Sequence, residues 1–205
     1  MRRAGPVRSS DVAQPFERVH EPTLPPWGTE LRSTRERCGT FCRVATHPAP
    51  DTLLHPLSGP ERSLSHFLTT FHLVLVVVDP FTHESAWLLA TAARVLETFR
   101  QSDCRVGWLV TGDADECRAF LGPHAAEFNT FADADRGLVK ALGLHHLPAI
   151  VHLGMDATVV DSAEGWHPAE WRRVTDGLAK MVHWKGPQLP AAKDPAPFPG
   201  TPALG

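Results

Sequence analysis

The chain has 205 residues, which suits one folded domain with tails better than two full domains. Apolar residues make up 42% of the chain, charged residues make up 21%, and the formal net charge is −3. This balance is typical of an ordinary soluble protein. No block of Lys and Arg stands out, so nucleic acid is not expected as a main partner, because phosphate binding needs clustered positive charge.

Membrane-spanning segments are not expected either. The longest unbroken aliphatic run is six residues, at 73–78, whereas a spanning helix needs about 20. Arg2 and Arg3 are not followed by the apolar stretch of a secretory signal. We therefore expect a cytoplasmic protein with no membrane contact.

Proline is concentrated toward both ends. Residues 1–43 hold five prolines and no sustained hydrophobic period, so we expect a disordered or loosely attached arm. Residues 185–205 hold six prolines, a density that excludes a helix or a central strand. This tail either stays extended or lies along the domain surface with Phe198 as an anchor. The folded domain is expected to cover residues 44–184.

Strands and helices alternate in the first half of this domain. Residues 73–79 (LVLVVVD) predict a strand buried on both faces, which Pro80 ends. Residues 84–100 place apolar side chains at helical spacing. Residues 105–111 (RVGWLVT) predict a second buried strand. Asp113 followed by a glutamate three residues later is typical of a capped helix start.

The second half predicts a short helix, a hairpin and a final helix. Residues 136–142 form the short helix, which Gly143 ends. Residues 149–153 and 158–161 flank the turn sequence GMDA and predict the hairpin. Pro168 suits the first position of the last helix. The order predicts an α/β fold, with a mixed central sheet and helices on both faces.

Several short motifs occur along the domain in an order known from one superfamily. They are 49–53 (APDTL), 57–59 (LSG), 63–65 (SLS), 77–80 (VVDP), 147–149 (LPA) and 154–157 (GMDA). In order and spacing they resemble the thioredoxin-like superfamily, and within it the redoxin branch of TlpA-like oxidoreductases and AhpC/TSA-like peroxiredoxins. The resemblance implies a thioredoxin-like fold over residues 44–184, with Pro148 as the family's cis-proline.

The sequence departs from the redoxin pattern where the reactive thiols are expected. A TlpA-like protein reads V-D-P-x-C-x-x-C at this place, whereas this chain has Thr82 and Ser85 at the two cysteine positions. The peroxiredoxin motif F-T-x-x-C also places its cysteine at Ser85. Redox cycling needs a thiolate, which a helix N-terminus stabilises, and a serine hydroxyl does not replace it. Thr82 instead suits the N-cap of the following helix.

We therefore predict a degenerate active site at Thr82, His83, Glu84 and Ser85, and a non-catalytic binding or accessory module rather than an enzyme. A protein, a peptide or a small ligand would bind in the groove between residues 81–85, including Phe81, and the Leu147–Pro148 turn. Backbone groups beside this proline can pair with an extended peptide. No cofactor is expected. The alternative is a thiol–disulfide oxidoreductase or a peroxiredoxin-like antioxidant protein that uses a relocated cysteine.

Four cysteines are candidates for that alternative. Cys38 and Cys42 form a close pair before the domain, and even with His47 they supply fewer than the four ligands of a typical zinc site. Cys104 begins a predicted strand and Cys117 lies early in a predicted helix. Buried cysteines usually act as small apolar residues.

Histidine is abundant near the predicted groove. His83, His145 and His146, with Glu84, could approach one another in this fold and hold a divalent metal or move a proton. Solvated loop residues are the more common outcome for such histidines. The sequence leaves the oligomeric state open.

Overall fold

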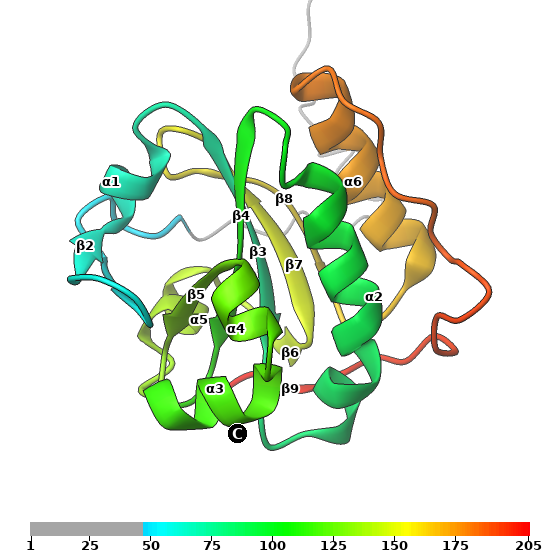
Figure 1. Ribbon diagram of the computed structural model, residues 1–205, viewed down its shortest axis with the longest axis horizontal. Helices are drawn as coiled ribbons and strands as arrows, with labels where there is room; N and C mark the ends of the chain where they lie inside the picture. The colour runs from blue at the N-terminus through cyan, green and yellow to red at the C-terminus, as the bar shows by residue number, and fades with distance from the viewer. Residues whose placement is uncertain (1–46) are drawn as a thin grey trace, which may run out of the picture. The chain divides into compact units, whose positions relative to one another are not determined.

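The structure is a computed structural model that describes residues 47–205. The predictions on residues 1–43, including the pair Cys38 and Cys42, lie outside the described residues. Within the described part, seven strands form one mixed sheet in the order β2-β1-β5-β4-β3-β7-β8 (Figure 1). The predicted α/β class is confirmed.

The elements have the following bounds. The strands of the large sheet are β1 (Leu53–Pro56), β2 (Arg62–Ser63), β3 (His72–Val78), β4 (Cys104–Val110), β5 (Asn129–Ala132), β7 (Ala149–Leu153) and β8 (Val159–Glu164). The helices are α1 (Leu64–Leu68), α2 (His83–Phe99), α3 (Ala114–Leu121), α4 (His124–Glu127), α5 (Gly137–Ala141) and α6 (Pro168–Met181). Two short strands, β6 (His146–Leu147) and β9 (Thr201–Pro202), pair separately.

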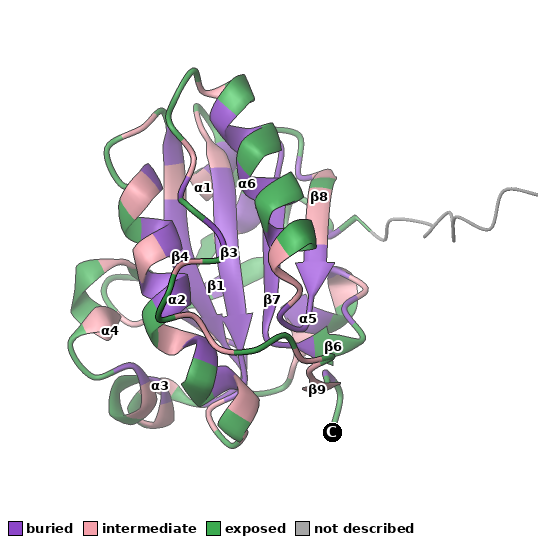
Figure 2. Cartoon of the chain, turned by 90° about the vertical axis from the view of Figure 1, so that its right-hand side faces the viewer, coloured by how far each residue is buried: buried purple, intermediate pink, exposed green. Residues whose placement is uncertain are grey.

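Strand β3 lies at the centre of the core and faces both of its halves. Its side chains alternate, because successive residues of a strand point to opposite faces of the sheet. Val74, Val76 and Val78 pack with buried residues of α2, α3 and α6, whereas Leu73 and Leu75 pack with those of α1 and α5. The central strands are buried along nearly their whole length (Figure 2). The continuous aliphatic run at 73–78 thus reflects burial on both faces, as predicted.

Several short strands, β5 among them, were not predicted from the sequence. β3, β4 and β5 run parallel, while β7 pairs antiparallel with β3 and forms the predicted hairpin with β8. β5 was missed because its four residues, NTFA, contain no apolar run, and only Thr130 and Phe131 among them are buried. The short helix α4 before it was missed for a similar reason, since it buries no residue.

The sequence signals for the starts of α3 and α6 predicted these helices correctly. Asp113 accepts hydrogen bonds from the backbone N–H groups of Asp115 and Glu116, and the Glu116 carboxylate accepts one from the Asp113 N–H. This is the predicted capping box of α3. α6 begins at Pro168, also as predicted.

The proline-rich tail lies along the domain surface. Phe198 and Trp166 exchange two backbone hydrogen bonds of 2.8 and 3.0 Å. Of the two alternatives given above, the structure therefore has the tail along the surface with Phe198 as an anchor. The tail passes along α2 and then reaches β9, beside β6 (Figures 1 and 2). In residues 47–205 no helix is both long and apolar enough to cross a membrane.

Candidate functional site

The end of β3 and the cis-proline turn lie at the same end of the sheet. Ala149 is paired with Val77 of β3, so the cis peptide between Leu147 and Pro148 lies beside the last residues of that strand. From the end of β3 the chain continues through Asp79 into α2. The two segments predicted to border a groove, 81–85 and 147–148, are therefore brought to one edge of the molecule.

Asp79 organises the loop between β3 and α2. Its side chain is buried, and one carboxylate oxygen accepts the Phe81 N–H at 2.9 Å while the other accepts the Arg136 guanidinium at 2.8 Å. Its carbonyl oxygen accepts the Thr82 N–H at 3.3 Å. The loop is thus fixed by one carboxylate, and Arg136 of the short segment before α5 neutralises the charge.

Ser85 is fully buried and its hydroxyl oxygen is already bound. It accepts the Asp79 N–H at 2.9 Å and the Thr82 hydroxyl at 2.9 Å. A buried oxygen that accepts two hydrogen bonds supports the loop and is not exposed to solvent. Thr82 does occupy the N-cap position of α2, as predicted.

The predicted capping hydrogen bond of Thr82 is wrong. Its hydroxyl caps no backbone N–H of α2. It lies instead 2.9 Å from the Ser85 oxygen and 3.2 Å from the Asp79 carbonyl oxygen, which are nearby acceptors on the loop side. The Thr82 and Ser85 hydroxyl groups are therefore hydrogen-bonded to each other.

The backbone edge beside Pro148 is paired with the chain's own C-terminus. β9 runs antiparallel to β6, with Thr201 opposite Leu147. The Ala203 N–H also donates to the His145 carbonyl oxygen at 2.8 Å. The edge that was expected to receive an extended peptide is therefore filled from within the molecule.

The histidine candidates have different partners. His83 stacks on Trp87 at 6.3 Å between ring centroids, whereas the His146 ring lies 3.4 Å from the buried carboxylate of Glu164. The backbone N–H groups of His145 and His146 donate to that same carboxylate. Across residues 47–205 no three side chains of His, Cys, Asp or Glu are grouped so that they could hold a metal ion.

The two described cysteines are buried thiols. Cys104 begins β4 opposite His72, at the end of the sheet remote from Ser85, and burial raises its pKa. Cys117 lies on α3, where burial, together with the carboxylates of Asp113 and Glu116, raises its pKa to about 11. Both thiols therefore stay protonated at neutral pH, and neither is a reactive thiolate.

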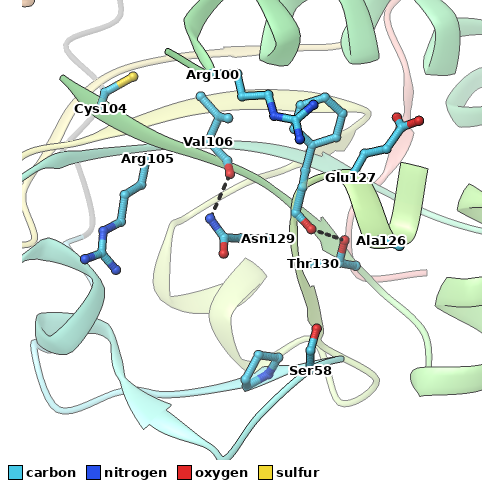
Figure 3. Close-up of a pocket in the computed structure, with 11 residues that line it drawn as sticks. Ser58, Arg100, Cys104, Arg105, Val106, Ala126, Glu127, Asn129 and Thr130 are labelled. Carbon is cyan, nitrogen blue, oxygen red and sulfur yellow. Dashed lines mark hydrogen bonds between the residues drawn. The ribbon is translucent and has the colours of Figure 1, made fainter. Parts of the chain in front are cut away.

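A cavity of about 410 Å³ lies elsewhere, along β4 and β5 (Figure 3). Among the predicted site residues only Cys104 lines it. Its arginines already contact protein groups: Arg100 pairs with Glu97 and lies over the Phe128 ring, and Arg105 lies over the Phe71 ring. This cavity therefore does not continue the site at the start of α2.

Arg136 and the C-terminal strand are parts of the site that sequence reasoning missed. Arg136 has a positive φ of 56° and reaches both the Asp79 carboxylate and the Ala203 carbonyl oxygen. No local pattern marks an arginine for that role. The tail carried one usable signal, a glycine between two prolines at 199–202, which fits a close backbone approach.

Comparisons with solved structures agree with this fold. The chain is similar to the thiol:disulfide interchange protein DsbE from Chlorobium tepidum (16% identity, TM-score 0.57, covering 67% of this chain and 97% of that one). It is also similar to a thioredoxin from Neisseria meningitidis (15%, TM-score 0.55, 68% and 91%) and to peroxiredoxin Q from Xanthomonas campestris (14%, TM-score 0.53, 68% and 96%). The fold is therefore thioredoxin-like. No family profile and no curated protein sequence matches the chain.

Replacing Ser85 should destabilise the fold. In Ser85→Ala the buried Asp79 N–H loses its acceptor, which should lower the free energy of unfolding by about 1–3 kcal/mol. The control is Ser65→Ala, where an exposed hydroxyl contacts only Ser63 and a change within about 0.5 kcal/mol is expected. Urea unfolding measures both, and equal values for the two variants would contradict the assigned role.

Proposed function

We propose that this chain is a non-catalytic binding module built on a redoxin fold, which does not exchange thiols and disulfides. The single observation that carries the proposal is the buried Ser85 oxygen, committed to the Asp79 N–H and the Thr82 hydroxyl. Thiol exchange requires a sulfur nucleophile at an accessible place, and oxygen forms no exchangeable disulfide. The start of α2 therefore serves as a rigid support.

The state of the described cysteines supports the same conclusion. Cys104 and Cys117 are both buried with raised pKa values, so a relocated reactive thiol in the domain is disfavoured. The alternative function, an oxidoreductase or peroxidase, would then depend on Cys38 and Cys42, which lie outside the described residues.

A direct assay separates the two functions. The purified full chain should show no dithiothreitol-dependent reduction of insulin and no consumption of hydrogen peroxide above a blank. Replacing all four cysteines by serine should leave this result unchanged. Turnover by the native chain that disappears in Cys38→Ser or Cys42→Ser would contradict the proposal and establish the alternative.

The surface beside Ser85 is suited to a protein partner. Phe81 is 68% exposed and Trp87 is 60% exposed, although both are large aromatic residues. The Phe198 ring meets Trp87 edge-on at 6.1 Å, which holds the indole in place. Exposed, ordered aromatic side chains are typical anchors of protein interfaces. We call Phe81, His83 and Trp87 the aromatic face, and we propose that the partner binds there.

Photo-cross-linking tests the aromatic face. With benzoylphenylalanine in place of Trp87, cells of the source organism should yield one discrete adduct, which mass spectrometry identifies and purified proteins reproduce. Adding Phe81→Ala should reduce the adduct at least tenfold. The control position is Met181, which is 45% exposed on α6 and should give no such adduct. The same adduct from both positions, or none from position 87, would contradict a partner at this face.

A further inference from the structure

The C-terminal strap, defined here as residues 185–205, is fastened in two different ways. Its first part is held by side chains. The Asp194 carboxylate is almost fully buried and accepts hydrogen bonds from Arg94 at 2.6 and 2.8 Å and from Thr91 at 2.8 Å. Burial opposes the ionisation of Asp194, yet the hydrogen bonds from Ala191, Arg94 and Thr91 lower its pKa. We call the contacts of Asp194 with Arg94 and Thr91 the latch, and they depend on these particular side chains.

The last part, residues 198–203, is held mainly through its backbone, although the Phe198 ring contacts Trp87 and the Ala203 side chain is buried. Phe198 pairs with Trp166, Thr201 lies opposite Leu147, and the Ala203 N–H donates to the His145 carbonyl oxygen. The Arg136 guanidinium then donates to the Ala203 carbonyl oxygen at 2.5 Å. Backbone pairing of this kind does not need one particular sequence, so another extended segment could form the same bonds.

Two glycines show that the space is built for such a strand. A Cβ atom at Gly200 would lie 2.6 Å from the Leu147 carbonyl oxygen, and Gly200 also has a φ of 85°. A Cβ atom at Gly165 would collide with the Pro199 carbonyl oxygen. The groove therefore selects a segment with glycine at the Gly200 position. The buried Ala203 indicates a small residue three positions later.

We propose that residues 145–147 and 165–166 form a peptide-binding groove whose resident ligand is this chain's own C-terminal segment. The external ligand is an extended segment of a protein partner with the order aromatic, proline, glycine and a small residue, as in Phe198, Pro199, Gly200 and Ala203. It enters only after the resident segment leaves. This inference rests on the proposed binding function. It adds the groove as a second binding surface besides the aromatic face, and it adds regulation of that groove by the C-terminal segment.

Tethering keeps the groove closed in the free protein. Only a few residues separate the latch at Asp194 from Phe198, so the effective concentration of the resident strand is on the order of millimolar or higher. A partner peptide of equal intrinsic affinity at micromolar concentration cannot displace it. Occupancy is also coupled to the aromatic face, since Arg136 binds both the Ala203 carbonyl oxygen and the Asp79 carboxylate that fixes the Phe81 N–H.

A labelled peptide with the sequence of residues 195–205 (PAPFPGTPALG) tests the groove by fluorescence anisotropy. The full-length variant Gly200→Val cannot seat its own strand and should bind the peptide at least tenfold more tightly than the native chain does. The matched control is Gly205→Val, because Gly205 has the same φ of 85° as Gly200 but no atom within 4 Å of its Cβ position, and this variant should behave like the native chain. The same peptide with valine at the position of Gly200 should bind neither the native chain nor either variant.

Two outcomes would overturn the proposal. One is equal peptide affinity in the native chain, Gly200→Val and Gly205→Val. The other is no binding to Gly200→Val when thermal unfolding shows that it is folded. If that variant does not fold, a chain ending at Pro195 replaces it under the same criteria. Cross-linking from position 87 is measured separately, so failure of the groove is distinguishable from failure of the proposed function.

Discussion

The ion pair between Asp79 and Arg136 is the interaction on which the functional end of this molecule depends. Asp79 holds the Phe81 N–H through its carboxylate and the Ser85 oxygen through its own N–H. Arg136 extends the same network to the Ala203 carbonyl oxygen. Both side chains are largely buried, and leaving one such charge unpaired costs about 3–5 kcal/mol. Arg136 thus connects the loop before α2 with the C-terminal strand.

In our proposal, the oxygen at position 85 gives this arrangement a structural role in place of thiol chemistry. The helix start, the parallel strands and the cis-proline turn are those of a thioredoxin-like fold. A thiol at such a place gains acidity and reacts, whereas a hydroxyl accepts hydrogen bonds and remains protonated. In our proposal the chain therefore keeps a rigid presentation of surface and loses electron transfer. Recognition is left to the aromatic face and to the groove that the strap fills.

Sequence reasoning predicted the parts of this fold that are specified locally. The aliphatic run at 73–78, the capping pair that begins at Asp113 and Pro168 each identified an element near its true bounds. β5 was missed because NTFA derives its place from pairing with β4, not from its own pattern. The position of the strap was also not predictable, since it depends on close contacts of Gly165 with the backbone of Pro199 and of Gly200 with the backbone of Leu147, which are distant in sequence. Of the candidate site, Thr82 and Ser85 were selected from their sequence positions, whereas their mutual hydrogen bond and the contacts of Arg136 follow from the three-dimensional arrangement.

Installing sulfur tests the central claim most directly. The Thr82 and Ser85 oxygens lie 2.9 Å apart, close enough for two sulfurs at these positions to form a bond of about 2.05 Å after small rotations. The test protein is Thr82→Cys/Ser85→Cys in a chain whose four native cysteines are serine, treated with oxidised glutathione. The account predicts a disulfide between the two introduced thiols, found by mass spectrometry, in a protein with the native near-ultraviolet circular dichroism. Two thiols that stay unlinked in that native fold would contradict it.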